Sequence, residues 1–191
     1  MNLCHLVLNT KDYKTEEANV SYDMLGKNEV FFLPYLMGER SPINDTNATG
    51  MFIGLRPNTT RVDMYQAVLE GVAFAIKDNL EIIKAFGIDV QSSCLCGGGA
   101  KSRLWREILA NVLDIELNIP TTEQGPGYGS AILAMVGAGR FDDVKQATDK
   151  FFEIKETVAP SKELSALYLG RYEKYRRIYP AVKKLYKEIK E

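Results

Sequence analysis

The sequence is poor in the side chains that build many metal and nucleophile sites. It has one histidine, one tryptophan and three cysteines in 191 residues. The single His5 excludes any site that needs two imidazoles from one chain. A zinc site made of Cys4, His5, Cys94 and Cys96 is disfavoured because these spacings match no zinc module. With three cysteines, one thiol stays unpaired if the other two form a bridge, which favours a reducing, cytoplasmic location.

Net charge and long apolar runs are also lacking. The formal net charge of −1 gives no general attraction to nucleic acid or anionic membranes. No apolar run approaches the roughly 20 residues that a membrane helix needs. The opening "MNLCHLVL" has no basic segment before its apolar patch and no cleavage site after it, so we expect no signal peptide. Its apolar, helix-like start suggests a piece of something longer.

The composition, 46% hydrophobic and 26% charged, is that of a soluble globular domain with its own core. Apolar residues at spacings of three and four predict a helix over 62–86, with a capping box at Thr60 and Asp63 and a stop at Gly87. The other expected elements are strands over 30–36, 50–55, 92–96 and 115–120 and helices over 102–113, 130–139, 142–151 and 161–191. Strands that alternate with helices are typical of an α/β fold.

The stretch "CLCGGGAKSRLW", Cys94 to Trp105, places three glycines between an expected strand and an expected helix. It is not a phosphate-binding loop of the Walker A type, because Ala100 precedes Lys101-Ser102 where that motif has glycine. The dinucleotide fingerprint fails at Ser102, where a third glycine is required. A turn without side chains before a helix N-terminus admits a ligand to the backbone, but it equally lets two backbones pack. The spacing leaves both interpretations open.

Two neighbouring features favour packing over chemistry. The second glycine turn, "EQGPGYG", is followed by Ser130 and Ala131, which break its near match to a dinucleotide loop and suit a closely packed helix. Cys94 and Cys96 lie two apart in an expected strand and therefore on one face of it. We expect buried structural cysteines there rather than a catalytic thiol.

Charged residues give three further expectations. Glu39 and Arg40, in the long polar loop, are expected to be solvated surface, with Arg40 a candidate for contacting an anion across a cleft. Glu70 lies among apolar neighbours in the long helix, either as a buried acceptor or facing a cleft. The segment 161–191 has nine Lys or Arg against four Glu, interleaved with tyrosines. An amphipathic helix that docks on the domain is favoured there over an RNA-binding or membrane-binding helix.

Three segments, considered together, carry a family resemblance. They are "FFLPYLMGERSPINDTNATGMFIGL" (31–55), "QAVLEGVAFAIKDNLEIIKAFG" (66–87), and "CGGGAKSRLWREILANVLD" (96–114) followed by "EQGPGYGSAILAMVGAG" (123–139). In this order and spacing they resemble the C-terminal lobe of FGGY-family carbohydrate kinases, most closely xylulose kinases. The resemblance covers nearly everything from Phe31 to the last helix.

The resemblance implies an actin-like ATPase (ribonuclease H-like) fold, with this chain as the C-terminal half of a two-lobed sugar kinase that ends in an amphipathic helix. It implies that the γ-phosphoryl group of ATP, with Mg²⁺, is transferred to a sugar hydroxyl. The sugar expected first is D-xylulose, which would be converted to xylulose 5-phosphate. Gly98, Gly99 and Ala100 match the adenosine-binding turn of the family. Arg103 aligns with a position whose side chain reaches the nucleotide in relatives.

The family's catalytic base, sugar-binding residues and phosphate loops have no counterpart in this sequence. The resemblance therefore implies no catalytic residue and no metal ligand within this chain, which we expect to fold but not to catalyse alone. We expect the remnant of a preceding segment over 1–29, an α/β core over 30–160 and a terminal helix over 161–191.

The expected partners are ATP or ADP and a pentulose held through the missing N-terminal lobe, but neither nucleic acid nor membrane. A second copy of the chain is a further expected partner, through the exposed inter-lobe face. Two alternatives remain open. The chain is a lobe of another kinase of the family, acting on glycerol, ribulose, gluconate or a deoxy sugar, or it is a stand-alone nucleotide-binding or interaction module.

Overall fold

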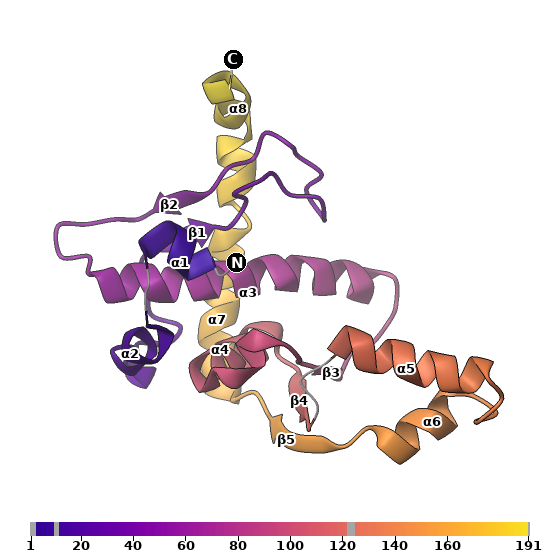
Figure 1. The fold of residues 1–191 in the computed structure, drawn as a ribbon. Coiled ribbons are helices and arrows are strands. Elements are labelled where there is room, and N and C mark those ends of the chain that lie inside the picture. The colour runs from indigo at the N-terminus through magenta and orange to yellow at the C-terminus, as the bar shows by residue number, and fades with distance from the viewer. Residues whose placement is uncertain (1–2, 10–11, 122–124, 191) are drawn as a thin grey trace.

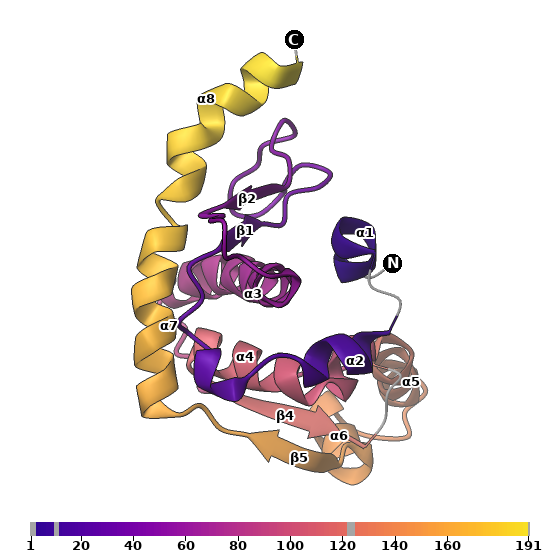
Figure 2. The ribbon, with the colours of Figure 1, turned by 90° about the vertical axis from the view of Figure 1, so that its left-hand side faces the viewer.

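The computed structural model of the chain describes residues 3–9, 12–121 and 125–190. The long helix α3 (Arg61–Ala85) lies between two layers, as Figures 1 and 2 show. On one side is the antiparallel pair β1 (Phe31–Leu33) and β2 (Met51–Ile53), and on the other is α4 (Arg103–Leu113) with a three-stranded sheet. The remaining helices are α1 (Leu3–Leu8), α2 (Tyr13–Ala18), η1 (Tyr22–Met24), η2 (Gly98–Lys101), α5 (Gly125–Gly137), α6 (Val144–Phe151), α7 (Lys162–Tyr175) and α8 (Ile178–Lys190).

The three-stranded sheet confirms the expected strand–helix–strand unit. β3 (Ser92–Cys94) pairs in parallel with β4 (Glu116–Pro120), and α4 connects them. β5 (Ile154–Val158) pairs antiparallel with the other edge of β4 and is a strand that the sequence pattern did not indicate. Four of its five residues are exposed, so it lacks the alternation of apolar and polar residues that marks a half-buried strand.

Helix α3 has the ends that its sequence predicts. The Thr60 Oγ1 accepts from the Asp63 N–H at 3.2 Å, and the Asp63 carboxylate accepts from the Thr60 N–H at 2.7 Å. This reciprocal pair is a capping box, and Gly87 ends the helix with a φ of 81°. In the middle of the helix, a Cβ added to Gly71 would lie 2.2 Å from the Phe32 carbonyl oxygen. The glycine therefore lets β1 approach the helix backbone.

The basic C-terminal segment docks on α3 through its tyrosines, as expected. The rings of Tyr168, Tyr172 and Tyr175 lie 6.3, 6.0 and 5.1 Å from the ring of Phe74, measured between centroids. All four side chains are buried. The core also takes in Cys4, so it extends into both segments that flank residues 30–160.

Two expectations about helices are wrong. The single helix expected over 161–191 is divided, because α7 ends at Tyr175 and α8 begins at Ile178. Pro180 explains the break, since it has no N–H for the carbonyl of Arg176 and would clash with it in a continuous helix. The turn expected at "GPGYG" is the start of α5, where Pro126 occupies a first-turn position that needs no N–H. Residues 122–124 lie outside the described part.

Within the described ranges, no helix is long and apolar enough to cross a membrane.

Candidate functional site

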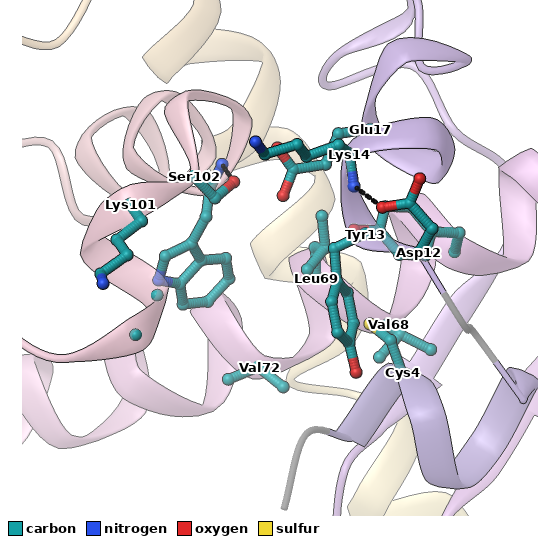
Figure 3. A pocket seen from close by; sticks show the side chains of 14 residues that line it. Cys4, Asp12, Tyr13, Lys14, Glu17, Val68, Leu69, Val72, Lys101 and Ser102 are labelled. Carbon is teal, nitrogen blue, oxygen red and sulfur yellow. Dashed lines mark hydrogen bonds between the residues drawn. The ribbon is translucent and has the colours of Figure 1, made fainter.

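A cavity of about 540 Å³ lies where α2, α3 and the start of α4 meet, and we call it the main cavity. Figure 3 shows it between the turn that carries Lys101 and Ser102 and the side chains of α2 and α3. The residues that line it are Cys4, Asp12, Tyr13, Lys14, Glu17, Tyr65, Val68, Leu69, Val72, Gly98, Gly99, Lys101, Ser102 and Trp105. Its volume lies within the roughly 300–1,000 Å³ of typical small-molecule sites.

The glycine turn forms one wall of the main cavity. Gly97 enters the turn with a φ of 83°, in the left-handed region that favours glycine. A Cβ added to Gly98 would have no atom within 4 Å, so the space beside this backbone is open. A Cβ added to Gly99 would meet the indole of Trp105 at 3.1 Å. The absent side chains thus keep room for a ligand at Gly98 and for the tryptophan ring at Gly99.

Ser102 ends the turn and caps α4, the helix that carries Trp105. Its Oγ accepts a hydrogen bond from the backbone N–H of Trp105 at 2.9 Å, which satisfies one of the free donors at the helix N-terminus. Trp105 is half-buried and packs against the core. It is the one tryptophan of the chain, so its fluorescence reports on this cavity.

The main cavity combines apolar walls with a charged rim. Val68, Leu69 and Val72 of α3 line it together with Trp105 of α4. Asp12 and Lys14 come from the start of α2 (Figure 3). The Asp12 carboxylate accepts from the Lys14 N–H at 3.1 Å and caps α2. A hydrogen bond from the Thr15 hydroxyl is the largest cause that lowers the pKa of Asp12. Apolar walls with a few polar groups at the rim suit a flat aromatic ring that carries a polar substituent.

The structure separates the four residues that the sequence assigns to the nucleotide. Gly98 and Gly99 line the main cavity. Ala100 lines a smaller one of about 270 Å³, between the turn and the strands β4 and β5, which we call the second cavity. Arg103 begins α4, and its guanidinium carbon lies 6.0 Å from the centre of the Tyr22 ring. It lines neither cavity.

Sequence reasoning missed the contribution of α2 to the main cavity. Tyr13, Lys14 and Glu17 line the cavity from this six-residue helix, whose sequence "YKTEEA" has no apolar periodicity. The signal for Trp105 was present, since it lies beside the apolar face of α4 and follows the glycine turn.

The cysteines near the turn correct an expectation. Cys94 and Cys96 are exposed free thiols rather than buried ones, and β3 ends at Cys94, so the two do not share a strand. Cys96 packs instead against the start of α5, where a Cβ at Gly125 would lie 2.5 Å from its sulfur. Partial burial raises the pKa of Cys94, and the neighbouring Cys96 adds to this, which disfavours a reactive thiolate.

Glu70 and Glu39 both accept hydrogen bonds from other residues of the chain. Glu70 is a buried acceptor, paired with Arg171 at 2.8 Å, which decides between the two possibilities left by the sequence. Glu39 accepts from the Ser41 N–H at 3.2 Å, and its neighbour Arg40 is exposed, as expected for a solvated loop. Across the described ranges, no group of three or more His, Cys, Asp or Glu side chains is placed to hold a metal ion.

Comparison with known proteins identifies the chain's relatives. Residues 5–138 match the model of the C-terminal domain of the FGGY family of carbohydrate kinases. The chain belongs to this family. A xylulose kinase of Staphylococcus epidermidis is 35% identical to this FGGY domain over 161 residues, which cover 84% of the chain and 32% of the relative. The chain spans about a third of the length of the curated relatives that it matches.

Solved structures agree on the fold. A ligand-bound xylulose kinase from Lactobacillus acidophilus has a TM-score of 0.83 at 26% identity, and the match covers 93% of this chain and 36% of that one. A gluconate kinase from the same organism has a TM-score of 0.82 at 26% identity over 93% of this chain and 35% of the other. The fold of the FGGY domain is therefore that of the C-terminal lobe of an actin-like ATPase.

Proposed function

We propose that the chain is the nucleotide-binding lobe of an ATP-dependent carbohydrate kinase that phosphorylates D-xylulose to xylulose 5-phosphate. One observation carries this proposal. The glycine turn that matches the family's adenosine-binding segment borders a cavity of about 540 Å³ with apolar walls. Gly98 leaves open space in it, where a side chain would obstruct a ligand.

The nucleotide fits the main cavity by its chemistry. An adenine ring is flat and apolar on its faces, and Trp105, Leu69 and Val72 offer matching surfaces. Lys14 and Lys101 on the rim supply positive charge for the phosphates. ATP supplies the phosphoryl group in such a kinase. In this proposal Mg²⁺ would bind in the full-length enzyme. This chain's own residues would bind and orient the adenine ring. We assign none of them as the general base that takes the proton of the sugar hydroxyl.

The choice of sugar rests on the relatives alone. The curated relatives include xylulose kinases at 29–37% identity. The gluconate kinase has nearly the same TM-score as the xylulose kinase, so the fold of this lobe does not select between the two sugars. We therefore place xylulose first because of sequence identity, with gluconate as the principal alternative. A cytoplasmic location is part of the same proposal.

The test measures ADP binding by the chain through Trp105 fluorescence and calorimetry. Gly98→Val places a side chain in the main cavity, and Gly170→Val is the matched control because a Cβ at Gly170 also meets no atom within 4 Å. We expect Gly98→Val to weaken ADP binding at least about tenfold, a change of about 1.4 kcal/mol, because the added side chain occupies the space that the ligand would fill. The control should bind as the wild type does.

Equal binding by wild type and Gly98→Val would refute the placement of the nucleotide beside the turn. The sugar is tested in a full-length kinase that carries this chain as its C-terminal lobe, with D-xylulose, gluconate and glycerol compared at equal concentration. A higher kcat/KM for gluconate or glycerol would refute the assignment of xylulose.

A further inference from the structure

The second cavity has an unusual balance of charge on its wall. Lys101, Arg106 and Lys155 line it, and Glu156 is the one carboxylate among the lining residues that the structure describes. Among these described residues, three cations against one anion leave an excess of two positive charges around about 270 Å³. An excess of one sign in a confined space raises the local concentration of ions of the opposite sign.

Arg106 has hydrogen-bonding capacity left over. Its Nη1 donates to Glu156 Oε2 at 2.6 Å, and its side chain is only 14% exposed. Its Nε is buried and has no hydrogen-bond acceptor among the residues that the structure describes. Leaving a buried donor unsatisfied costs about 1–3 kcal/mol, so a small shift of the guanidinium toward an acceptor in the cavity would recover this free energy.

An irregularity in β5 brings Lys155 to the cavity. Ile119 pairs with Glu156, but the next residue, Pro120, pairs with Ile154, so Lys155 is left over between them. Successive side chains of a regular strand point to opposite faces. Here both Lys155 and Glu156 line the second cavity, because the bulge redirects one of them.

We propose that the second cavity binds a phosphate-sized anion, held by Lys101, Arg106 and Lys155. The volume of about 270 Å³ lies below the range of sites for drug-sized ligands, which points to an inorganic anion or a single phosphoryl group. Glu156 competes with the anion for Arg106, so its carboxylate limits the affinity.

The two cavities share a wall. Lys101 lines both, while Gly98 and Gly99 face the main cavity and Gly97 and Ala100 face the second. An anion beside Lys101 therefore changes the charge that a ligand in the main cavity meets. The anion site itself does not depend on the proposed nucleotide function, because its cations are defined without the main cavity.

The test is a calorimetric titration of the chain with inorganic phosphate at constant ionic strength, with chloride as the replaced anion. We expect Lys155→Gln to weaken phosphate binding about tenfold, the effect of losing one hydrogen bond to a charged group. Lys155 is exposed, so this variant should fold. Lys145→Gln is the matched control, since Lys145 lies on α6 and pairs with Asp149 away from the cavity.

Glu156→Gln gives a prediction of opposite sign. Removing the competing carboxylate should tighten phosphate binding, a gain that damage to the fold would not produce. Thermal melts of each variant check the fold separately. Absence of phosphate binding by the wild type up to about 50 mM would overturn the proposal. A dissociation constant of that size corresponds to a binding free energy of under about 2 kcal/mol. Equal phosphate affinity in Lys155→Gln and Lys145→Gln would overturn it as well.

Repeating the phosphate titration with saturating ADP distinguishes two sources of the anion. Mutual exclusion would mean that the cavity takes the phosphoryl end of a nucleotide, and simultaneous binding would mean that it takes free phosphate. Phosphate can bind when ADP does not, and the reverse also holds. The two proposals can therefore fail separately.

Discussion

Arg171 of α7 donates from Nη2 to Oε2 of Glu70 in α3 at 2.8 Å, and both side chains are buried. The other carboxylate oxygen of Glu70 accepts from Gln66 at 2.7 Å and from the Tyr168 hydroxyl at 3.2 Å. Burial raises the pKa of Glu70, while the charge of Arg171 and these hydrogen bonds oppose the rise. Arg171 also donates to the Val30 carbonyl at 3.0 Å. This network ties the C-terminal segment to the helix that supports the main cavity.

Breaking this pair from one side should be costly. Glu70→Gln leaves the buried guanidinium of Arg171 without its counter-charge, so we expect a loss of about 3–5 kcal/mol in the free energy of unfolding. Arg171→Met should cost a similar amount. The double variant should cost less than the sum of the two, because it leaves no unpaired buried charge. Urea denaturation measures all three, and strictly additive losses would contradict the coupling.

The long central helix could be predicted from the sequence because its signals are local. The capping box at Thr60, the apolar spacing and Gly87 all act within α3 itself. The role of Glu70 could not be predicted, since its partner Arg171 lies 101 positions away. A charged residue within the apolar face of a helix indicates that a partner exists, but the local sequence does not show which residue it is.

The candidate site was predictable in part for a similar reason. The glycine turn is visible in the sequence as a run without side chains, and the family resemblance pointed to it. Its division between two cavities depends on α2, β4 and β5, which are brought to the turn by tertiary packing. The bulge at Lys155 depends on the pairing register with Pro120, which no local pattern encodes.

Gly71 should tolerate no side chain. An added Cβ would lie 2.2 Å from the Phe32 carbonyl oxygen, which is backbone and cannot move aside as a flexible side chain does. We expect Gly71→Ala to destabilise the fold by about 1–3 kcal/mol, the usual cost of overpacking, despite the better helix propensity of alanine. Gly170→Ala is the control in α7, where the added methyl meets no atom within 4 Å. It should be neutral or stabilising, and thermal unfolding compares the two variants.

The isolated chain should self-associate through exposed apolar side chains. Phe86 is 80% exposed and Ile88 is 57% exposed, both just after the C-terminal end of α3. Burying one such large side chain contributes about 1.5–3 kcal/mol, so Phe86→Ser should weaken association about tenfold or more. Sedimentation equilibrium measures this, with Lys145→Ser as the control, because Lys145 is an exposed polar residue of α6 and its loss removes no apolar side chain. A wild-type chain that stays monomeric at high concentration would refute the expectation.

The last prediction concerns acid stability. Tyr179 of α8 donates its hydroxyl to Asp45 Oδ2 at 2.8 Å, and this hydrogen bond is the largest cause that lowers the pKa of Asp45 below its ordinary 3.8. A carboxyl group whose pKa is lower in the folded state favours folding above its unfolded pKa. That contribution is lost as the pH falls through the folded pKa. The hydrogen bond should therefore stabilise the fold at neutral pH and cease to do so in acid.

Tyr179→Phe keeps the ring that packs edge-on against Tyr35 and removes only the hydroxyl. We expect the pKa of Asp45, followed by NMR of its carboxyl carbon, to rise toward 3.8 in this variant. The difference in unfolding free energy between wild type and variant should be constant near neutral pH. It should shrink as the pH falls below 3.8 and through the lower pKa of folded wild-type Asp45. Tyr22→Phe, an exposed position, serves as the control and should leave Asp45 unchanged. An unchanged Asp45 titration in Tyr179→Phe would show that the backbone N–H of Asn47, rather than the tyrosine, holds the pKa low.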